Sequence, residues 1–151
     1  MKKVSSYKCW IFSVIAGLAT VSLPVAAQSV SNPTPRSQVA IPTLYQSIPV
    51  KAQFCSDEAS TCGRNILYSL PSKYAPSGEL DTESQYEVFD FKNGVMVYLL
   101  TIRGVQDDSI RAERYRVSFK KEEAGLRLVQ VGRQQQCTRG SVKGWTKRNC
   151  P

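Results

Sequence analysis

The sequence predicts an α+β domain in which a short helix packs on a four-stranded antiparallel meander clasped by two disulfides. A strong hairpin turn, Asn93-Gly94, joins two runs of strand-forming residues, and the segment 114–119 alternates apolar and polar residues. The cysteines that follow the leader are even in number. If the segment 66–70 is not helical, the alternative is an all-β half-barrel.

Residues 1–27 have the order of a secretory signal peptide. Lysines precede an uncharged run from Trp10 to Leu23, and the sequence Pro-Val-Ala-Ala closes it, so we expect cleavage before Gln28. The run is shorter than the roughly 20 apolar residues that cross a membrane as a helix. We therefore expect export to the periplasm or the extracellular space, with no integral membrane span after cleavage.

Four cysteines remain after this cleavage: Cys55, Cys62, Cys137 and Cys150. Four cysteines allow three pairings. The pattern favours 55 with 62 and 137 with 150, because the members of each pair are close in sequence and the predicted sheet lies between the two pairs. The spacing lacks the C-x2-C knuckle of zinc sites and the C-x-x-C of redox motifs. We expect structural disulfides, no metal and no cofactor.

Residues 28–54 form a proline-rich lead-in that we expect to be extended or loosely attached, followed by a single domain over 55–151 with a basic C-terminal loop. At the start of that domain, Ser56 is a candidate helix cap before two acidic residues. Apolar residues at near-helical spacing follow, up to Pro71.

A bridge between Cys55 and Cys62 limits this helix. Seven residues of helix span about 10 Å, whereas bridged cysteines lie within roughly 7 Å between Cα atoms. The helix therefore cannot run unbroken from one cysteine to the other, and Gly63 is the natural place for an irregularity.

Four strands follow. The first two, 86–91 and 95–102, flank the Asn93-Gly94 turn, and the second is apolar on both faces, which indicates a central strand. In 114–119 the apolar residues point one way and the other three, Arg114, Arg116 and Ser118, point the other way, which predicts one solvated face. A turn then leads to the fourth strand, 126–131.

The end of the chain resembles small secreted proteins of unknown function that are common in cyanobacteria. The matching features are Asp-Asp-Ser at 107–109, Arg-Tyr-Arg-Val-Ser-Phe at 114–119, Leu-Arg-Leu-Val at 126–129, and the ending with Cys137, Gly144-Trp145 and Cys150-Pro151. This resemblance covers about a third of the chain and implies no activity. More loosely, the same strands are similar to the final hairpin of NTF2-like, or cystatin-like, domains, which implies a sheet wrapped around a long N-terminal helix.

The residues that could support catalysis are few. The chain has no histidine, which removes the usual general base at neutral pH, Ser-His and Cys-His pairs and imidazole zinc sites. The Ser118 to Lys121 spacing matches a Ser-x-x-Lys pattern without its partner motifs, so we interpret it as a chance match. The acid pairs at 57–58, 107–108 and 122–123 are interpreted as helix-start and turn residues. We assign no catalytic residue.

The basic residues are concentrated at the C-terminus. The chain has 20 Lys plus Arg against 12 Asp plus Glu, and no acid follows Glu123. We expect the basic residues to surround Trp145, held together by the 137–150 bridge, as a weak anion-binding site. Its members are Arg127, Arg133, Arg139, Lys143, Trp145, Lys147 and Arg148.

These observations favour an exported, non-catalytic module that binds an anionic polysaccharide, a cell-wall polymer or an envelope protein. Nucleic acid is a poorer match than these anions because export separates the protein from most of it. One alternative is an enzyme of NTF2-like type that uses carboxylates in a pocket between helix and sheet. Another is a structural envelope protein whose basic loop is only solvated.

Overall fold

The computed structural model describes residues 34–77 and 84–151. The predicted signal peptide, its cleavage site and the first residues of the lead-in lie outside this part. The helical elements are α1 (Arg36–Val39), η1 (Pro42–Leu44) and α2 (Ala59–Tyr68). The strands are β1 (Gln46–Ile48), β2 (Phe54–Cys55), β3 (Ser84–Phe91), β4 (Val95–Asp107), β5 (Ile110–Glu122), β6 (Gly125–Cys137) and β7 (Trp145–Thr146).

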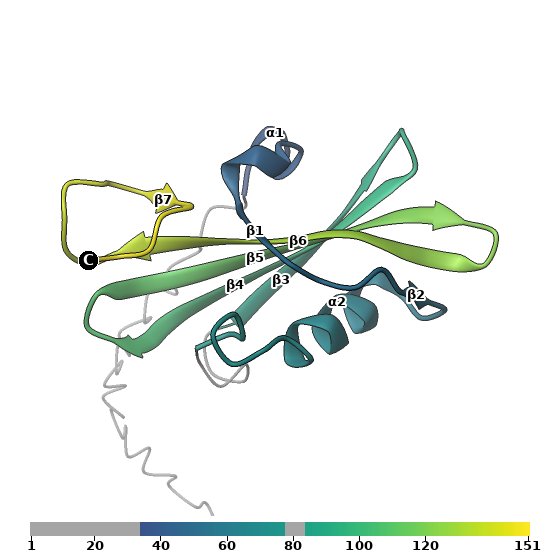
Figure 1. Cartoon of the computed structure of the whole chain (residues 1–151). Coiled ribbons are helices and arrows are strands. Elements are labelled where there is room, and N and C mark those ends of the chain that lie inside the picture. Colours follow the sequence, from purple (N-terminus) through teal and green to yellow (C-terminus); the bar gives the residue numbers. More distant parts are fainter. Residues whose placement is uncertain (1–33, 78–83) are drawn as a thin grey trace, which may run out of the picture. The chain divides into compact units, whose positions relative to one another are not determined.

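All seven strands belong to one open antiparallel sheet, and the strand order is β1-β6-β5-β4-β3 (Figure 1). The predicted meander is confirmed as β3 to β6, and Asn93-Gly94 forms the β3–β4 turn with Gly94 at a φ of 75°. The prediction of four strands was wrong because β1, β2 and β7 also pair with β6. These strands have two or three residues each, too few to produce a legible alternation.

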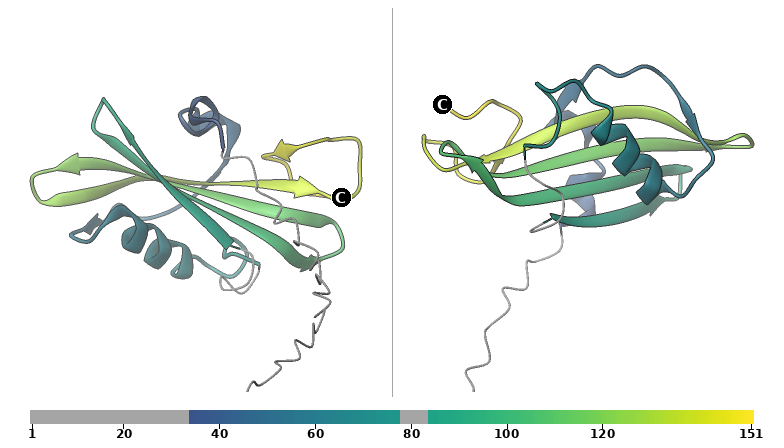
Figure 2. Two further views of the ribbon diagram at one scale, coloured as in Figure 1. Left: turned by 180° about the vertical axis from the view of Figure 1, so that it is seen from behind. Right: turned by 90° about the horizontal axis from the view of Figure 1, so that it is seen from below.

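Helix α2 covers one face of the sheet (Figure 2). Its buried Ile66 and Leu67 pack in a core cluster with Tyr98 and Tyr115 of the central strands. The helix begins at Ala59 with Glu58 as its N-cap, so the predicted Ser56 cap is wrong. Gly63 lies inside the helix. A Cβ atom there would lie 2.8 Å from Cβ of Tyr98 and closer still to the ring, so this glycine permits close packing rather than an irregularity.

Residues from the lead-in cover the opposite face. Val39 of α1 is fully buried and packs with Tyr45, Val97 and Leu99. The Nε atom of Arg116 donates a 2.8 Å hydrogen bond to the backbone carbonyl of Val39. Residues 34–54 therefore contribute to the core, which differs from the loosely attached segment that we expected.

The predicted solvated face of the segment 114–119 was wrong. Arg114 is 8% exposed, Arg116 is 4% exposed, and Ser118 is also buried. Apolar and polar residues alternate along the strand as expected, but both of its faces are covered: one by α2, the other by α1, by η1 and by Trp145 of β7. Alternation shows which residues share a face, whereas solvent exposure depends on which distant segment packs there.

Within residues 34–77 and 84–151, none of the helices combines the length and the apolar character needed to cross a membrane.

Candidate anion-binding surface

Two disulfides join the predicted pairs. Cys55 and Cys62 have Cα atoms 6.1 Å apart, and those of Cys137 and Cys150 are 5.4 Å apart. The second bridge closes the C-terminal loop. Within this loop β7 pairs with β6, so that Trp145 lies opposite Gln136. The loop is therefore fixed to the edge of the sheet at both ends and in its middle. Such disulfides are typical of an oxidising compartment.

Trp145 contacts a buried cation of the sheet. The guanidinium carbon of Arg114 lies 4.0 Å from the centroid of the Trp145 ring. On the sheet, Arg114 Nε donates a long hydrogen bond of 3.4 Å to Oγ1 of Thr101. Burial lowers the pKa of Arg114, and the positive charge of Arg103 on the neighbouring strand acts in the same direction. Trp145 thus covers one buried cation, and a second cation acts on that residue from the neighbouring strand.

The exposed cations of the loop have few acidic partners. Nζ of Lys147 donates a 3.2 Å hydrogen bond to the backbone carbonyl of Thr43. Arg139 lies 3.9 Å from Asp108, and both side chains are largely exposed. Among the described residues no carboxylate lies within 4.0 Å of Lys143, Lys147 or Arg148. We call Arg139, Lys143, Trp145, Lys147 and Arg148 the cationic loop surface.

The structure separates Arg127 from this surface, which corrects the predicted site. Arg127 lies near the start of β6, opposite Phe54 of β2, whereas the loop leaves the sheet at Cys137. At about 3.3 Å per strand residue, roughly 30 Å separates the two points. Arg127 pairs instead with Glu122, at 2.6 Å across the β5–β6 hairpin.

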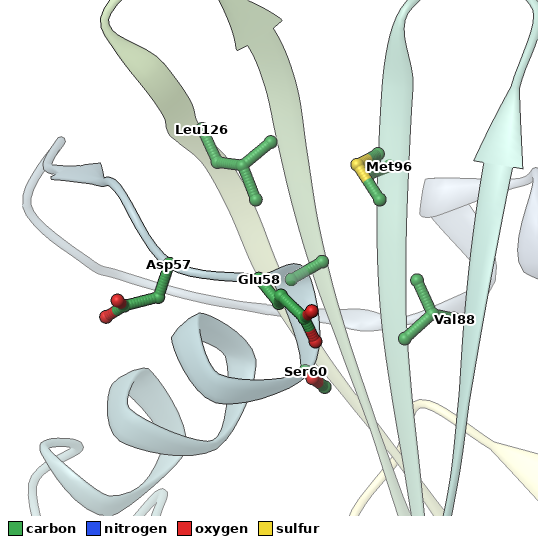
Figure 3. Close-up of a pocket in the computed structure, with 7 residues that line it drawn as sticks. Asp57, Glu58, Ser60, Val88, Met96 and Leu126 are labelled. Carbon is green, nitrogen blue, oxygen red and sulfur yellow. The ribbon is translucent and has the colours of Figure 1, made fainter.

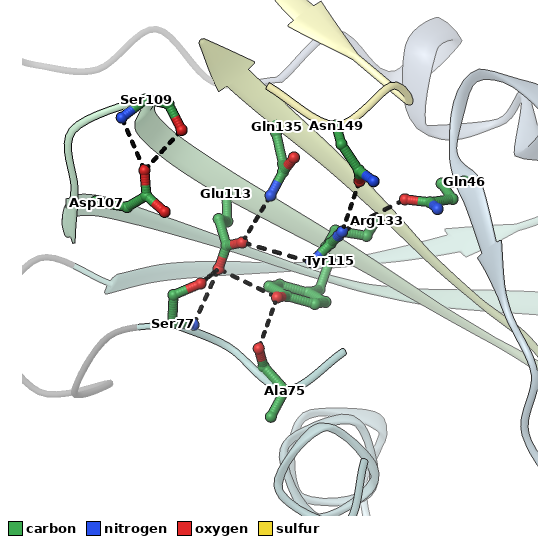
Figure 4. Close-up of polar contacts among 10 residues, drawn as sticks. All are labelled: Gln46, Ala75, Ser77, Asp107, Ser109, Glu113, Tyr115, Arg133, Gln135 and Asn149. Carbon is green, nitrogen blue, oxygen red and sulfur yellow. Dashed lines mark hydrogen bonds and ion pairs between the residues drawn. The ribbon is translucent and has the colours of Figure 1, made fainter. Parts of the chain in front are cut away.

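Arg133 supports the loop from inside. Only 12% of its side chain is exposed, and its Nη1 lies 3.8 Å from Oε1 of Glu113. Its Nη2 atom donates a 3.2 Å hydrogen bond to Oδ1 of Asn149, beside Cys150, and reaches Gln46 of β1 (Figure 4). Arg133 therefore joins the C-terminal loop and the lead-in to β6. Its guanidinium group is used mainly in these internal contacts.

Glu113 is fully buried at the centre of this network. Oε2 accepts hydrogen bonds from the backbone N–H and the hydroxyl of Ser77 and from the hydroxyl of Tyr115 (Figure 4). Oε1 accepts one from Nε2 of Gln135. Burial, followed by the charge of Glu113, raises the pKa of Tyr115. A buried carboxylate that accepts this many hydrogen bonds holds the loop after α2 in place and is not a free acid.

A cavity of about 410 Å³ lies between the N-terminus of α2 and the sheet. Val88, Met96 and Leu126 line it from the strands, and Glu58 lies at the helix side (Figure 3). The carboxylate of Asp57 points away from these strands. A mechanism that uses two carboxylates would require both acids to point into the cavity, and these two acids do not converge there. Asp57 also lies close to Cys55 and Cys62, but these sulfurs are joined in the disulfide.

The other acids and the Ser-x-x-Lys residues have structural contacts. Asp107 accepts hydrogen bonds from the hydroxyl and the N–H of Ser109, which lower the pKa of its carboxyl. Ser118 is buried and donates to the carbonyl of Gln130. Lys121 is exposed and pairs with Asp90 at 2.6 Å.

Three members of the site neighbourhood were not predicted: Arg103, Arg114 and Thr43. Arg114 was assigned to solvent because of its polar position in the alternation, although Trp145, the only aromatic residue after Phe119, was a candidate partner for it. Arg103 shares the face of Arg114 in the β4–β5 register. The contact of Thr43 with Lys147 spans 104 residues, and no local pattern indicates it.

Comparisons with protein-family models, with curated proteins and with solved structures found no match. The likeness to cyanobacterial secreted proteins and to NTF2-like domains therefore rests on the sequence motifs alone.

Proposed function

We propose that this protein is an exported, non-catalytic module that binds an acidic polysaccharide or wall polymer through the cationic loop surface. The observation that supports this most is that four exposed cations and the half-buried Trp145 belong to one short loop that is closed by the Cys137–Cys150 bridge. Asp108, at 3.9 Å from Arg139, is the single acid that pairs with these cations among the described residues.

Three features of the loop and of the sheet beneath it favour binding of a polymer. A charged site that is already ordered loses less conformational entropy on binding than a flexible tail. The buried Arg114 lies behind Trp145, and the exposed Arg103 on the same face of the sheet adds a second positive charge, which the nearby Glu87 offsets in part. The half-buried indole offers an apolar surface for a sugar ring beside these charges.

Charge reversal tests the proposal. The triple variant Arg139→Glu, Lys143→Glu and Lys147→Glu should elute from a polyuronate column at a much lower salt concentration than the wild type. It should also be lost from cell-envelope fractions. The matched control reverses Lys51, Lys73 and Lys92, three exposed lysines far from the loop in sequence, so that both variants carry the same net charge.

The control separates a local site from general basicity. Equal weakening in both triple variants means that only net charge attracts the polymer. Unchanged retention of the loop variant on the column and in envelope fractions overturns the proposal and leaves the structural envelope protein as the better account. Circular dichroism of each variant establishes that the fold is retained.

A further inference from the structure

The two edges of the sheet are covered very differently. Along β6, the short strands β7, β1 and β2 pair in turn with residues from the C-terminal end to the N-terminal end. At the opposite edge, β3 is the last strand of the described residues, and β4 is the strand with which it pairs. An uncovered edge strand offers backbone groups to an incoming strand.

Two contacts show which backbone groups of β3 point outward. The carbonyl of Phe91 accepts a hydrogen bond from Gly94 in the hairpin turn, so Phe91 faces β4. The carbonyl of Asp90 accepts one from the Arg36 side chain and faces outward. Because strand residues alternate in the direction of both backbone groups, those of Val88 and Tyr86 also face outward.

The side chains at these positions lie next to the cavity. Tyr86 is 54% exposed and Val88 is 43% exposed, and both share a face of the sheet with Tyr98 and Met96. Val88 and Met96 line the cavity of about 410 Å³ (Figure 3). A peptide strand paired with β3 would place every second side chain on this face, beside the cavity mouth.

The cavity rim carries acids at its Val88 end, whereas at the Tyr86 end Arg64 of α2 lies 6.0 Å from the Tyr86 ring centroid. Asp57 and Glu58 precede α2 at this rim, and among the described residues neither lies within 4.0 Å of a Lys or Arg nitrogen. At the far end of β3, Arg36 lies 4.6 Å from the Phe91 ring centroid and occupies the Asp90 carbonyl. The open stretch is therefore short, and it favours a partner that is apolar and carries a positive charge at the Val88 end, beside Glu58.

We propose that β3 accepts an extended peptide of another protein as an eighth strand at Tyr86 and Val88. One apolar side chain of this peptide enters the cavity, and a Lys or Arg two residues away lies near Glu58. In this mode of recognition the backbone ladder supplies affinity and the cavity supplies selectivity. The site is separate from the cationic loop surface and does not depend on the polymer-binding proposal.

A titration of ¹⁵N-labelled protein tests this site. The probe is a capped seven-residue peptide in which Leu, Lys and Leu alternate with Thr. We expect saturable shifts of the Tyr86 and Val88 amide signals. Methylation of the peptide amide nitrogens at Leu and Lys should weaken binding at least tenfold, because these amides would pair with β3. Replacement of the peptide Lys with Glu should weaken binding severalfold.

Two protein variants complete the test. Val88→Pro removes an outward N–H and leaves the β4 ladder intact, so it should abolish the shifts while circular dichroism stays unchanged. Val142→Ala, at an exposed apolar residue of the C-terminal loop, should bind as the wild type does. If the Val88 variant misfolds, Glu58→Gln should still reduce the preference for Lys over Glu in the peptide.

Three results overturn the proposal. The first is the absence of amide shifts at 1 mM peptide. The second is equal binding of the methylated and unmethylated peptides, which means that the cavity binds an apolar group without strand pairing. The third is a concentration-dependent dimer with protected Tyr86 and Val88 amides, which makes a second copy the occupant.

Discussion

The guanidinium carbon of Arg114 lies 4.0 Å from the centroid of the Trp145 ring, so the aromatic residue of the C-terminal loop covers a buried cation of the central sheet. Such a desolvated cation–π contact contributes about 2 kcal/mol. It joins the rigid strand β5 to the loop that carries the exposed cations. The position of the cationic loop surface therefore depends on the packing of the sheet as well as on the Cys137–Cys150 bridge.

Trp145→Ala should lower the free energy of unfolding by about 2 kcal/mol, because it removes the contact with Arg114 and leaves a gap at the loop. Urea unfolding followed by circular dichroism measures this change. Val142→Ala in the same loop should change stability by no more than about 0.5 kcal/mol. Equal effects of the two variants would show that the contact with Arg114 contributes nothing.

Glu113→Gln should destabilise the protein by about 3 kcal/mol. The amide oxygen can accept on one side only, so either the donors from Ser77 and Tyr115 or the donor from Gln135 lose their acceptor, and Arg133 loses its carboxylate. The exposed Glu123→Gln is the control and should be nearly neutral. A loss below 1 kcal/mol in urea unfolding of the Glu113 variant would contradict the anchoring role of this carboxylate.

Gly63→Ala should be destabilising although alanine is the better helix former. The added Cβ would overlap the Tyr98 side chain, and such overpacking costs about 1–3 kcal/mol, which outweighs the roughly 1 kcal/mol gained in helix propensity. Asn65→Ala, at an exposed site on α2, should instead stabilise slightly. Thermal unfolding of the pair tests this, and a stabilised Gly63 variant contradicts the close packing.

Alkaline pH should reduce stability through the buried tyrosines. Burial raises the pKa of Tyr45, Tyr98 and Tyr115 above the ordinary value of 10.0. The unfolded chain therefore releases these protons first, and stability is full below pH 10 and falls as the pH rises above it. Tyrosinate absorbance at pH 11 should be lower in the native than in the denatured protein. Identical titration curves for the two states would contradict this.

Local patterns predicted much of the sheet. The Asn93-Gly94 turn and the alternation in 114–119 gave β3 to β6 and their order, because hairpin neighbours are adjacent in sequence. The disulfides also followed from spacing, since each joins cysteines within one short stretch. The strands extend beyond the predicted ranges because their ends are polar, as at Glu113 and Gln135.

Contacts between distant segments were not predictable in this way. The burial of Arg116 depends on a hydrogen bond to Val39, 77 residues away. The pairing of β1 with β6 likewise joins Gln46 to Arg133. Neither contact changes the periodicity of the strands, so the polar residues of β5 were assigned to solvent. The same error left Arg114 out of the candidate site, whereas Arg127 was included because it belongs to the acid-free end of the sequence.

The fluorescence of Trp145 tests the central proposal most directly. The chain has two tryptophans, Trp10 and Trp145, so in the Trp10→Phe variant the emission reports on the loop alone. Titration with polyuronate should shift this emission saturably, high salt should reverse the shift, and a neutral glucan of the same length should cause none. An emission spectrum that polyuronate leaves unchanged, while the protein remains folded, would contradict binding at the cationic loop surface.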